Sequence, residues 1–409
     1  MEYKGIDYFR KKLAKKTRRV ELRYKYYEMK NITKDFDIST PPKLRNVMSC
    51  LGWCSKSVDA LADRLSFREF QNDNYEMNEI FEANNPDILF DSAIVNALIG
   101  SCSFIYISND ENGSPRLQVL NAYDATGELD PFTNMLTEGY AVLSRDANNK
   151  PIEEAYFTPG RTDYYLNGEF EGSYEYNAPY PLLVPVIFKP DAKRNFGHSR
   201  ISRACMSIQD SAVRTIKRSE ISAEFFSYPQ KWATGVSEDA EMDKWKATMS
   251  SLLMFTKDED GEKPTIGQFQ QQSMAPHIDQ LRMFAAAFAG ETGLTLDDLG
   301  FVTDNPSSAE AIKSAHENLR LIARKAQKTF GSAFINVGYL SACVRDNMAY
   351  TREEAIKTKT KWEPVFEPDA STLSLIGDGL IKINQTIPGY LNKENLRDLT
   401  GIVPGEDNE

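Results

Sequence analysis

The clearest structural pattern of the chain is found in the stretch MAPHIDQLRMFAAAFAGETGLTLDDLGFVTDNPSSAEAIKSAHENLRLIARKAQKTFG, residues 274–331. Its first helix should end at Gly293, because glycine readily takes the left-handed conformation found at helix C-termini. A loop follows, and Ser307 with Glu310 three residues later forms a capping box. Apolar residues then recur at spacings of three and four over residues 312–344, which predicts an unusually long helix.

Toward the N-terminus from this stretch, the pattern is also helical. The periodicity predicts one long helix over residues 197–226, and Tyr228-Pro229 ends it because a residue before proline disfavours the helical region. Residues 228–274 have the pattern of a small insert, with a short helix near residues 237–249 and a hairpin turn.

Toward the C-terminus, Gly331 and Gly338 are candidate bend points inside the long helix. Residues 357–368 are predicted to contain a late strand, and residues 371–383 and 392–401 two terminal helices.

The first 190 residues are predicted to be α+β. Residues 10–25 form a basic helix with an incomplete apolar stripe. Either its long side chains cover a neighbouring element, or it contacts nucleic acid or another subunit's acidic face. Residues 42–100 have helical spacing, with residues 87–98 as a second, shorter helical stretch. Alternating patterns then predict strands near residues 102–108, 116–123, 140–146, 153–160, 162–170 and 182–190, with tight turns at Asn112-Gly113 and Asn167-Gly168.

Composition excludes several classes of protein. The chain has 409 residues, a formal net charge of -11 and 11% aromatic residues, which argues against wholesale disorder. No apolar run approaches the roughly 20 residues that a membrane helix needs, and no secretory signal is evident, so we expect a soluble protein. Five cysteines without a paired pattern indicate a reduced, intracellular environment rather than a disulfide framework or a zinc site.

The sequence carries little catalytic chemistry. Its 3 histidines lie far apart, and neither a nucleophile elbow, a phosphate-binding loop nor a dinucleotide fingerprint occurs. The tempting acidic cluster is Asp297, Asp298 and Asp304, but three carboxylates of one loop do not provide the converging ligands of a two-metal nuclease. We therefore predict no enzyme activity, no cofactor and no metal, and assign this loop a mechanical or contact role.

The motifs of this stretch resemble those of the portal proteins of tailed double-stranded DNA phages. In that family a helix ending near ETGL, here residues 291–294, precedes a loop and NP-S-SAEAI, here residues 305–312, which opens a very long helix. A second match is LLVPVIF followed by GHSRISRACMSIQDSAVRTIKRSEISAEFF. The resemblance covers most of residues 180–370, whereas the part before it agrees only in being α+β.

The resemblance implies an α+β portal fold divided into named parts. These are a wing with the basic helix (1–198), a stem helix (199–227), a clip with a small α/β fold (228–274), a second stem helix (275–293), a tunnel loop (294–306), a long kinked wing helix with a strand (307–369) and a short helical crown (370–409).

It also implies a dodecameric ring at one capsid vertex, through which viral DNA is packaged and ejected. Its expected partners are further copies of the chain, the large terminase, the head-completion adaptor, the major capsid protein, scaffold and sequence-independent duplex DNA, but no membrane. The protein would reside in the virion after assembly in the host cytoplasm. Whether residues 10–25 contact capsid protein, scaffold or a neighbouring subunit is left open.

The resemblance assigns roles to particular residues. Those expected to face DNA in the tunnel loop are Asp297, Asp298, Phe301, Thr303, Asp304 and Asn305. Those expected to contact terminase or adaptor from the clip are Trp245, Lys257, Asp258, Glu259 and Asp260. Ser307 and Glu310 would begin the long helix.

Charge allows a prediction about the channel. DNA bound tightly at every phosphate would not slide, so we expect mainly acidic or neutral residues along the bore. Lys257 and the basic positions within residues 313–328 would interrupt it, although Arg320, Arg324, Lys325 and Lys328 are equally suited to pairing with a neighbouring subunit. The alternatives are another virion head–tail connector or a minor head structural protein, and, as an enzyme, a nuclease.

Overall fold

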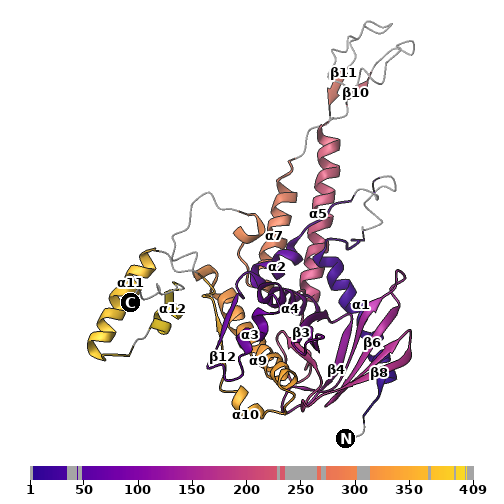
Figure 1. Cartoon of the computed structure of the whole chain (residues 1–409). Coiled ribbons are helices and arrows are strands. Elements are labelled where there is room, and N and C mark those ends of the chain that lie inside the picture. The colour runs from indigo at the N-terminus through magenta and orange to yellow at the C-terminus, as the bar shows by residue number, and fades with distance from the viewer. Residues whose placement is uncertain are drawn as a thin grey trace, which may run out of the picture.

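The computed structural model describes residues 3–34, 44, 48–227, 231–234, 265–268, 273–301, 314–366, 370–390, 393–400 and 402. Helices and strands both occur, as the sequence predicted. Within these residues the strands form four antiparallel sheets. Figure 1 shows a body of helices and sheets, from which the helices α5 (Arg203–Ser227) and α7 (Ala275–Thr292) project side by side.

The largest sheet contains β4 to β8 in chain order. The strands are β4 (Ala125–Leu129), β5 (Leu136–Arg145), β6 (Pro151–Thr158), β7 (Arg161–Leu166) and β8 (Glu169–Glu175). The predicted turn at Asn167-Gly168 joins β7 to β8, and both of its residues have positive φ angles. β4 was not predicted, because its sequence ATGEL lacks the alternation of apolar residues that marks a strand.

Helix α1 (Ile6–Tyr27) is the predicted basic helix, and it packs against this sheet. Phe9 and Leu13 are buried in a small cluster with Tyr140, Val142 and Tyr156. The helix therefore covers a neighbouring element of its own chain, which was one of the two expectations for it.

The central sheet has the order β3-β2-β9. It contains β2 (Cys102–Asn109), β3 (Pro115–Asn121) and β9 (Leu183–Ile187). Helix α4 (Pro86–Gly100) leads into β2, and α9 (Glu317–Arg345) packs beside β9, so most of the buried apolar residues lie in one cluster around this sheet.

The second helical stretch expected at residues 87–98 is present as α4, but the helical spacing expected over the rest of residues 42–100 is interrupted by a strand. Helices α2 (Trp53–Ala62) and α3 (Met77–Glu82) are separated by strand β1 (Phe67–Gln71). β1 pairs with β12 (Lys359–Trp362), the predicted late strand, with Phe67 opposite Trp362. The partner strand lies almost 300 residues away, so no local spacing could reveal the pairing.

Gly331 and Gly338 allow close packing of α9. A Cβ atom at Gly338 would lie 2.7 Å from the Met77 sulfur of α3, and one at Gly331 would overlap the Thr360 hydroxyl of β12. Both positions lie within the continuous helix Glu317–Arg345. These contacts give a physical reason for glycine that does not depend on bending.

Three further helices lie toward the C-terminus. They are α10 (Arg352–Ala355), α11 (Ala370–Thr386) and α12 (Lys393–Thr400). Helix α12 contacts the β1–β12 pair, because its Asp398 forms ion pairs with Arg68 of β1, at 2.8 Å, and with Lys361 of β12. Figure 1 shows α11 and α12 in yellow, at the side of the body.

Candidate functional site: the paired helices α5 and α7 and the segment after them

The most prominent feature beyond the body is the helix pair α5 (Arg203–Ser227) and α7 (Ala275–Thr292). Strands β10 (Lys231–Thr234) and β11 (Thr265–Gln268) pair at its far end (Figure 1). As predicted, α5 ends just before Tyr228-Pro229, and α7 ends at Gly293, whose φ of 72° is left-handed.

The two helices are joined to the body at their base. Phe288 of α7 is fully buried, and its ring centroid lies 5.6 Å from that of Trp53 in α2. Farther out, Thr215 of α5 donates a hydrogen bond to Gln280 of α7 at 3.1 Å. The outer part of α7 also exposes the apolar side chains Ile278 and Met283, which are 59% and 57% exposed.

Arg200 connects the base of the pair to the body. Its Nε donates to the Ser57 carbonyl at 3.1 Å, and its guanidinium also donates to the Thr292 carbonyl at the end of α7 at 2.5 Å. Burial lowers the pKa of Arg200 to about 10, so the side chain still carries its charge at neutral pH. Carbonyl groups and the negative C-terminal end of α7 stabilise that charge. One side chain thus joins α2 and α7 to the start of α5.

Helix α5 begins later than expected: the sequence pattern predicted a helix over residues 197–226, but α5 starts at Arg203. Gly197 has a φ of +71°, and residues 199–202 are not helical. The Ser202 hydroxyl accepts the backbone N–H of Cys205 at 3.1 Å, which caps the helix that begins at Arg203. The segment before it is held by long-range contacts, because the Arg200 N–H donates to the Leu98 carbonyl at 2.7 Å.

The segment after α7 is partly packed rather than wholly open. Leu294 and Leu299 are buried, and Phe301 packs against the main core. Leu299 is the last residue of a short 3-10 helix, η2 (Asp297–Leu299). The Asp298 carboxylate accepts the Thr295 N–H and hydroxyl, both at 2.9 Å, whereas Asp297 is exposed. Of the two aspartates, Asp297 is therefore the one free to meet a ligand.

Many residues given roles by the resemblance lie outside the described residues. They are Trp245, Lys257, Asp258, Glu259, Asp260, Thr303, Asp304, Asn305, Ser307 and Glu310, together with the expected short helix near residues 237–249. Asp298 lies 3.8 Å from His316, an ion-pair distance that connects the segment after α7 to the start of α9.

The basic positions near the start of α9 are arranged in two ways. Arg320 pairs with Glu317 of its own helix at 2.6 Å. Arg324, Lys325 and Lys328 line a cleft of about 490 Å³ beside Trp362.

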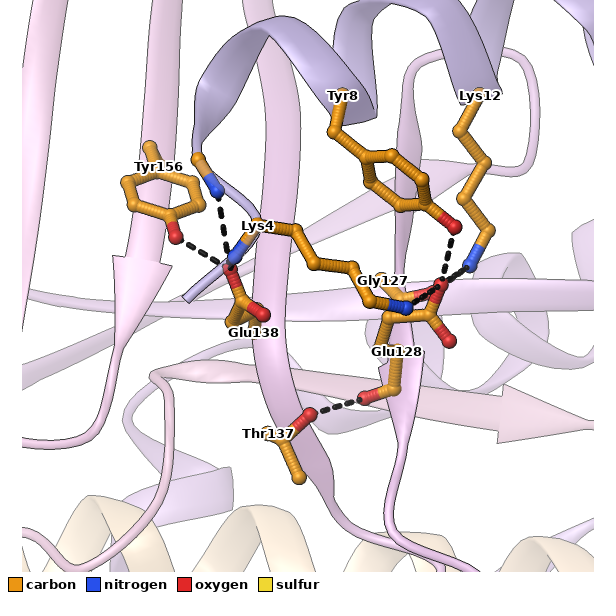
Figure 2. A network of polar contacts seen from close by, with 9 residues as sticks. Lys4, Tyr8, Lys12, Gly127, Glu128, Thr137, Glu138 and Tyr156 are labelled. Carbon is orange, nitrogen blue, oxygen red and sulfur yellow. Dashed lines mark hydrogen bonds and ion pairs between the residues drawn. The ribbon is translucent and has the colours of Figure 1, made fainter. Parts of the chain in front are cut away.

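Sequence reasoning missed the carboxylates that hold α1. Figure 2 shows Glu128, on β4, beside Lys4, Tyr8 and Lys12 of the N-terminal segment, at 3.2, 2.9 and 2.6 Å. Glu138, which is 4% exposed, accepts the backbone N–H of Lys4 at 2.9 Å, just before the start of α1 (Figure 2). These acids are separated from α1 by more than a hundred residues, so no local motif marks them.

Glu154 makes the most complete of these contacts. Its two carboxylate oxygens accept Arg10 Nε at 2.9 Å and Arg10 Nη2 at 2.7 Å, and it also accepts the Tyr140 hydroxyl. Burial alone would raise the pKa of Glu154, but the hydrogen bonds from Arg10 and Tyr140 outweigh it and hold the pKa below 4.5. The same balance, with Lys12 as the main donor, lowers the pKa of Glu128.

The lowered pKa values of Glu154 and Glu128 predict that the contacts between α1 and the sheet weaken at low pH. A carboxylate whose folded pKa is depressed stabilises the fold fully above its unfolded value, near 4.5, and progressively less as pH falls through the folded pKa. Glu154→Gln should therefore lower the free energy of unfolding by about 2 kcal/mol at pH 7 and by much less near pH 3. The expected loss is smaller than for a fully buried ion pair, because solvent reaches the partly exposed Arg10. The measurement is the unfolding midpoint of both proteins from pH 3 to 7.

The matched control is Glu171→Gln, an exposed glutamate on β8 of the same sheet, which should have little effect at any pH. A stability difference for Glu154→Gln that stays constant across the whole pH range would contradict this prediction.

Within the described ranges, no group of three metal-ligating side chains meets, and no helix is long and apolar enough to cross a bilayer.

Comparison with known proteins gives the family. The family model described as "Phage portal protein, SPP1 Gp6-like" matches residues 6–369. This chain belongs to that family of phage portal proteins. The resemblance of residues 274–331 to portal proteins is thereby confirmed, and the match extends through the N-terminal part, where the sequence had supported only a general α+β character.

Individual relatives agree with this. The chain is 24% identical to the portal protein of Mycobacterium phage L5 over 397 residues, which are 91% of this chain and 80% of that protein. It is likewise 24% identical to the portal protein of Mycobacterium phage D29, covering 94% and 82% of the two chains. A chain in the neck of an empty gene transfer agent particle has a similar fold, with a TM-score of 0.50 and 14% identity over 87% of this portal protein and 91% of that chain.

Proposed function

We propose that this portal protein forms a dodecameric ring at one capsid vertex and is the channel through which viral DNA is packaged and ejected. The observation that carries the proposal is the family match over residues 6–369, together with a helix pair that projects from an α+β body. The related neck structure was computed with sixfold symmetry, and a ring of twelve subunits is compatible with a sixfold axis.

In this proposal the structural parts keep the roles that the resemblance implied. Residues 1–198 and 307–369 are the wing, α5 and α7 the stem, residues 228–274 the clip, residues 294–306 the tunnel loop and residues 370–409 the crown. The β10–β11 pair at the end of the stem would form the base of the clip. Asp297, which is exposed, is the described acidic residue best suited to face passing DNA.

Exposed apolar side chains support assembly of several copies. Besides Ile278 and Met283 on α7, Leu375 and Ile381 of α11 are 73% and 58% exposed. Apolar side chains gathered on projecting elements are typical of surfaces that become buried on association. A closed ring would bury them while leaving the charged faces of the stem to line the channel.

The clip is proposed to bind the large terminase and, later, the head-completion adaptor. The major capsid protein and scaffold would surround the wing during assembly in the host cytoplasm, and duplex DNA would pass without sequence-specific contacts. The mature protein would then reside in the virion. No bond-breaking step is part of this proposal.

The direct experiment is negative-stain imaging of the purified full chain, combined with its mass in solution. Rings with a central hole and a mass near twelve subunits are expected. A protein that remains monomeric at high concentration, in conditions where its fold is intact, would contradict the proposal.

A substitution on α7 tests the same proposal residue by residue. Met283→Arg replaces an exposed apolar side chain of the stem by a charge, and we expect it to abolish rings while leaving the monomer's unfolding midpoint unchanged. Met348→Arg is the matched control, because Met348 is 56% exposed against 57% for Met283 but lies after α9, away from the stem. Rings formed equally well by both variants would contradict burial of this face between subunits.

A further inference from the structure

A cavity of about 390 Å³ lies beside α1, on the body of the protein rather than on the stem. One wall is the helix itself, and the others are the Gly100–Cys102 junction, β4 and residues 193–197. Its size is in the range of pockets that hold small ligands.

Basic side chains dominate the lining of this cavity. Lys12, Lys16, Arg19 and Arg23 follow one another along one face of α1 over about 17 Å, since 11 residues of helix rise about 1.5 Å each. The exposed Lys193 and Arg194 lie at its rim. The face is therefore a row of cations, one helical turn apart, that lines one side of a cavity open to solvent.

The negative charge in the lining of the cavity is already neutralised by ion pairs. Glu128 is the carboxylate among the lining residues, and it pairs with Lys4 and Lys12. In the part of the chain that the structure describes, Lys16, Arg19 and Arg23 have no carboxylate within 4.0 Å. Arg23 donates to the Gly100 carbonyl at 3.3 Å, and the Lys16 ammonium lies 4.7 Å from the centre of the Phe196 ring.

These cations are unfavourable where they stand. Burial, and then the neighbouring Lys12, lower the pKa of Lys16. Burial, and then Arg19 and Arg194, lower the pKa of Arg23. Like charges held close together in a partly buried cleft repel one another, and they are stabilised when an anion enters among them.

We propose that this cavity is a binding site for an oligophosphate group, either a free phosphate chain or the phosphates of a nucleotide. Several positive charges of α1 must be neutralised in a small volume. A phosphate chain brings several negative charges close together, whereas an acidic peptide spaces its charges along a backbone. Arginine and lysine are the side chains that bind phosphate, arginine through two parallel hydrogen bonds. Duplex DNA is too wide to enter, so the site is separate from the proposed channel.

The apolar part of the lining offers a place for a base. Phe104 and Phe196 both line the cavity, and their ring centroids lie 6.1 Å apart. Phe104 is almost fully buried, so the partly buried ring of Phe196 is the aromatic surface available to a base, whereas a free phosphate chain would use the cations alone.

The test is calorimetric titration of the full chain at about 0.15 M salt with sodium triphosphate, ATP and adenosine. Saturable binding of triphosphate or ATP supports the proposal. Equal affinity for both identifies the phosphate chain as the ligand, and tighter binding of ATP identifies a nucleotide. Saturable binding of poly-glutamate with none of triphosphate or ATP would overturn it in favour of an acidic polypeptide, and so would an absence of any binding.

Two double variants locate the site. Lys16→Gln with Arg23→Gln should weaken binding by about tenfold or more, because two charge-assisted contacts are lost. Lys11→Gln with Lys15→Gln removes the same charge from exposed positions of the same helix and should change it by less than about twofold. Equal weakening by both pairs would show non-specific attraction and overturn the proposal.

The cavity variant should be at least as stable as the wild type without ligand, since it relieves repulsion between closely spaced, half-buried cations. If it fails to fold, Arg19→Gln at the exposed mouth of the cavity gives the second measurement, and unchanged affinity there would also contradict the site.

Discussion

Gly197→Ala should destabilise this portal protein by about 3–5 kcal/mol, which is large for a change of one methyl group. Gly197 has a φ of +71°, and its N–H donates to the Arg194 carbonyl at 2.8 Å. A Cβ atom there would overlap the carbonyl oxygen of Phe188 and lie 2.9 Å from Ile187 Cγ2. The Phe188 carbonyl directly follows β9, and a backbone group cannot move aside as a flexible side chain can.

The matched control separates the overlap from the backbone strain. Gly113, in the predicted turn between β2 and β3, has a φ of +82°, but a Cβ atom there would meet nothing within 4 Å. Gly113→Ala should therefore lose only the strain of the left-handed conformation, about 1–2 kcal/mol. Chemical denaturation of both variants is the measurement, and equal losses would contradict the proposed close packing at Gly197.

Arg200→Met should lower stability by about 3 kcal/mol, because it leaves the carbonyls of Ser57 and Thr292 without their buried donor. The relief of desolvating a charge offsets part of the loss, since methionine needs no hydrogen bonds. Arg200→Lys should recover only part of the stability, as one ammonium does not reproduce the two directions of the guanidinium. Thermal unfolding of both variants measures the effect.

Arg203→Met is the control for this second prediction, because Arg203 is exposed one turn away and should matter by less than about 0.5 kcal/mol. The link also has a consequence for assembly. Since Arg200 connects the end of α7 to α2, its loss should let the stem lean differently in different subunits, and rings of Arg200→Met should be heterogeneous in stained images. An Arg200→Met protein as stable as the wild type would show that the two carbonyls are satisfied in another way.

Local interactions made parts of this structure predictable. The end of α7 at Gly293 follows from the left-handed freedom of glycine, and its N–H bonds to the Ala289 carbonyl within the same helix at 2.7 Å. The Asn167-Gly168 turn and the end of α5 before Tyr228-Pro229 have the same character. Each of these depends on residues adjacent in the chain, so each is present in the sequence pattern.

The missed features depend on distant partners. Local spacing predicts a helix at β1, because the strand depends on pairing with β12. It also predicts too early a start for α5, because Gly197 packs against the residues at the end of β9. The role of Glu154 was invisible for the same reason, since Arg10 lies 144 positions before it. An isolated glutamate on a strand looks like any other solvent-facing residue.

Residue patterns alone were enough to recognise the family, the order of most helices and strands, and the helix ends that local backbone chemistry sets. The folded chain was needed to show which carboxylates hold α1, how Arg200 joins the stem to the body, and that the cations of α1 line a cavity. Capping, turn formation and hydrophobic spacing act over a few residues. Burial, ion pairing and close packing instead depend on which distant segments the fold brings together.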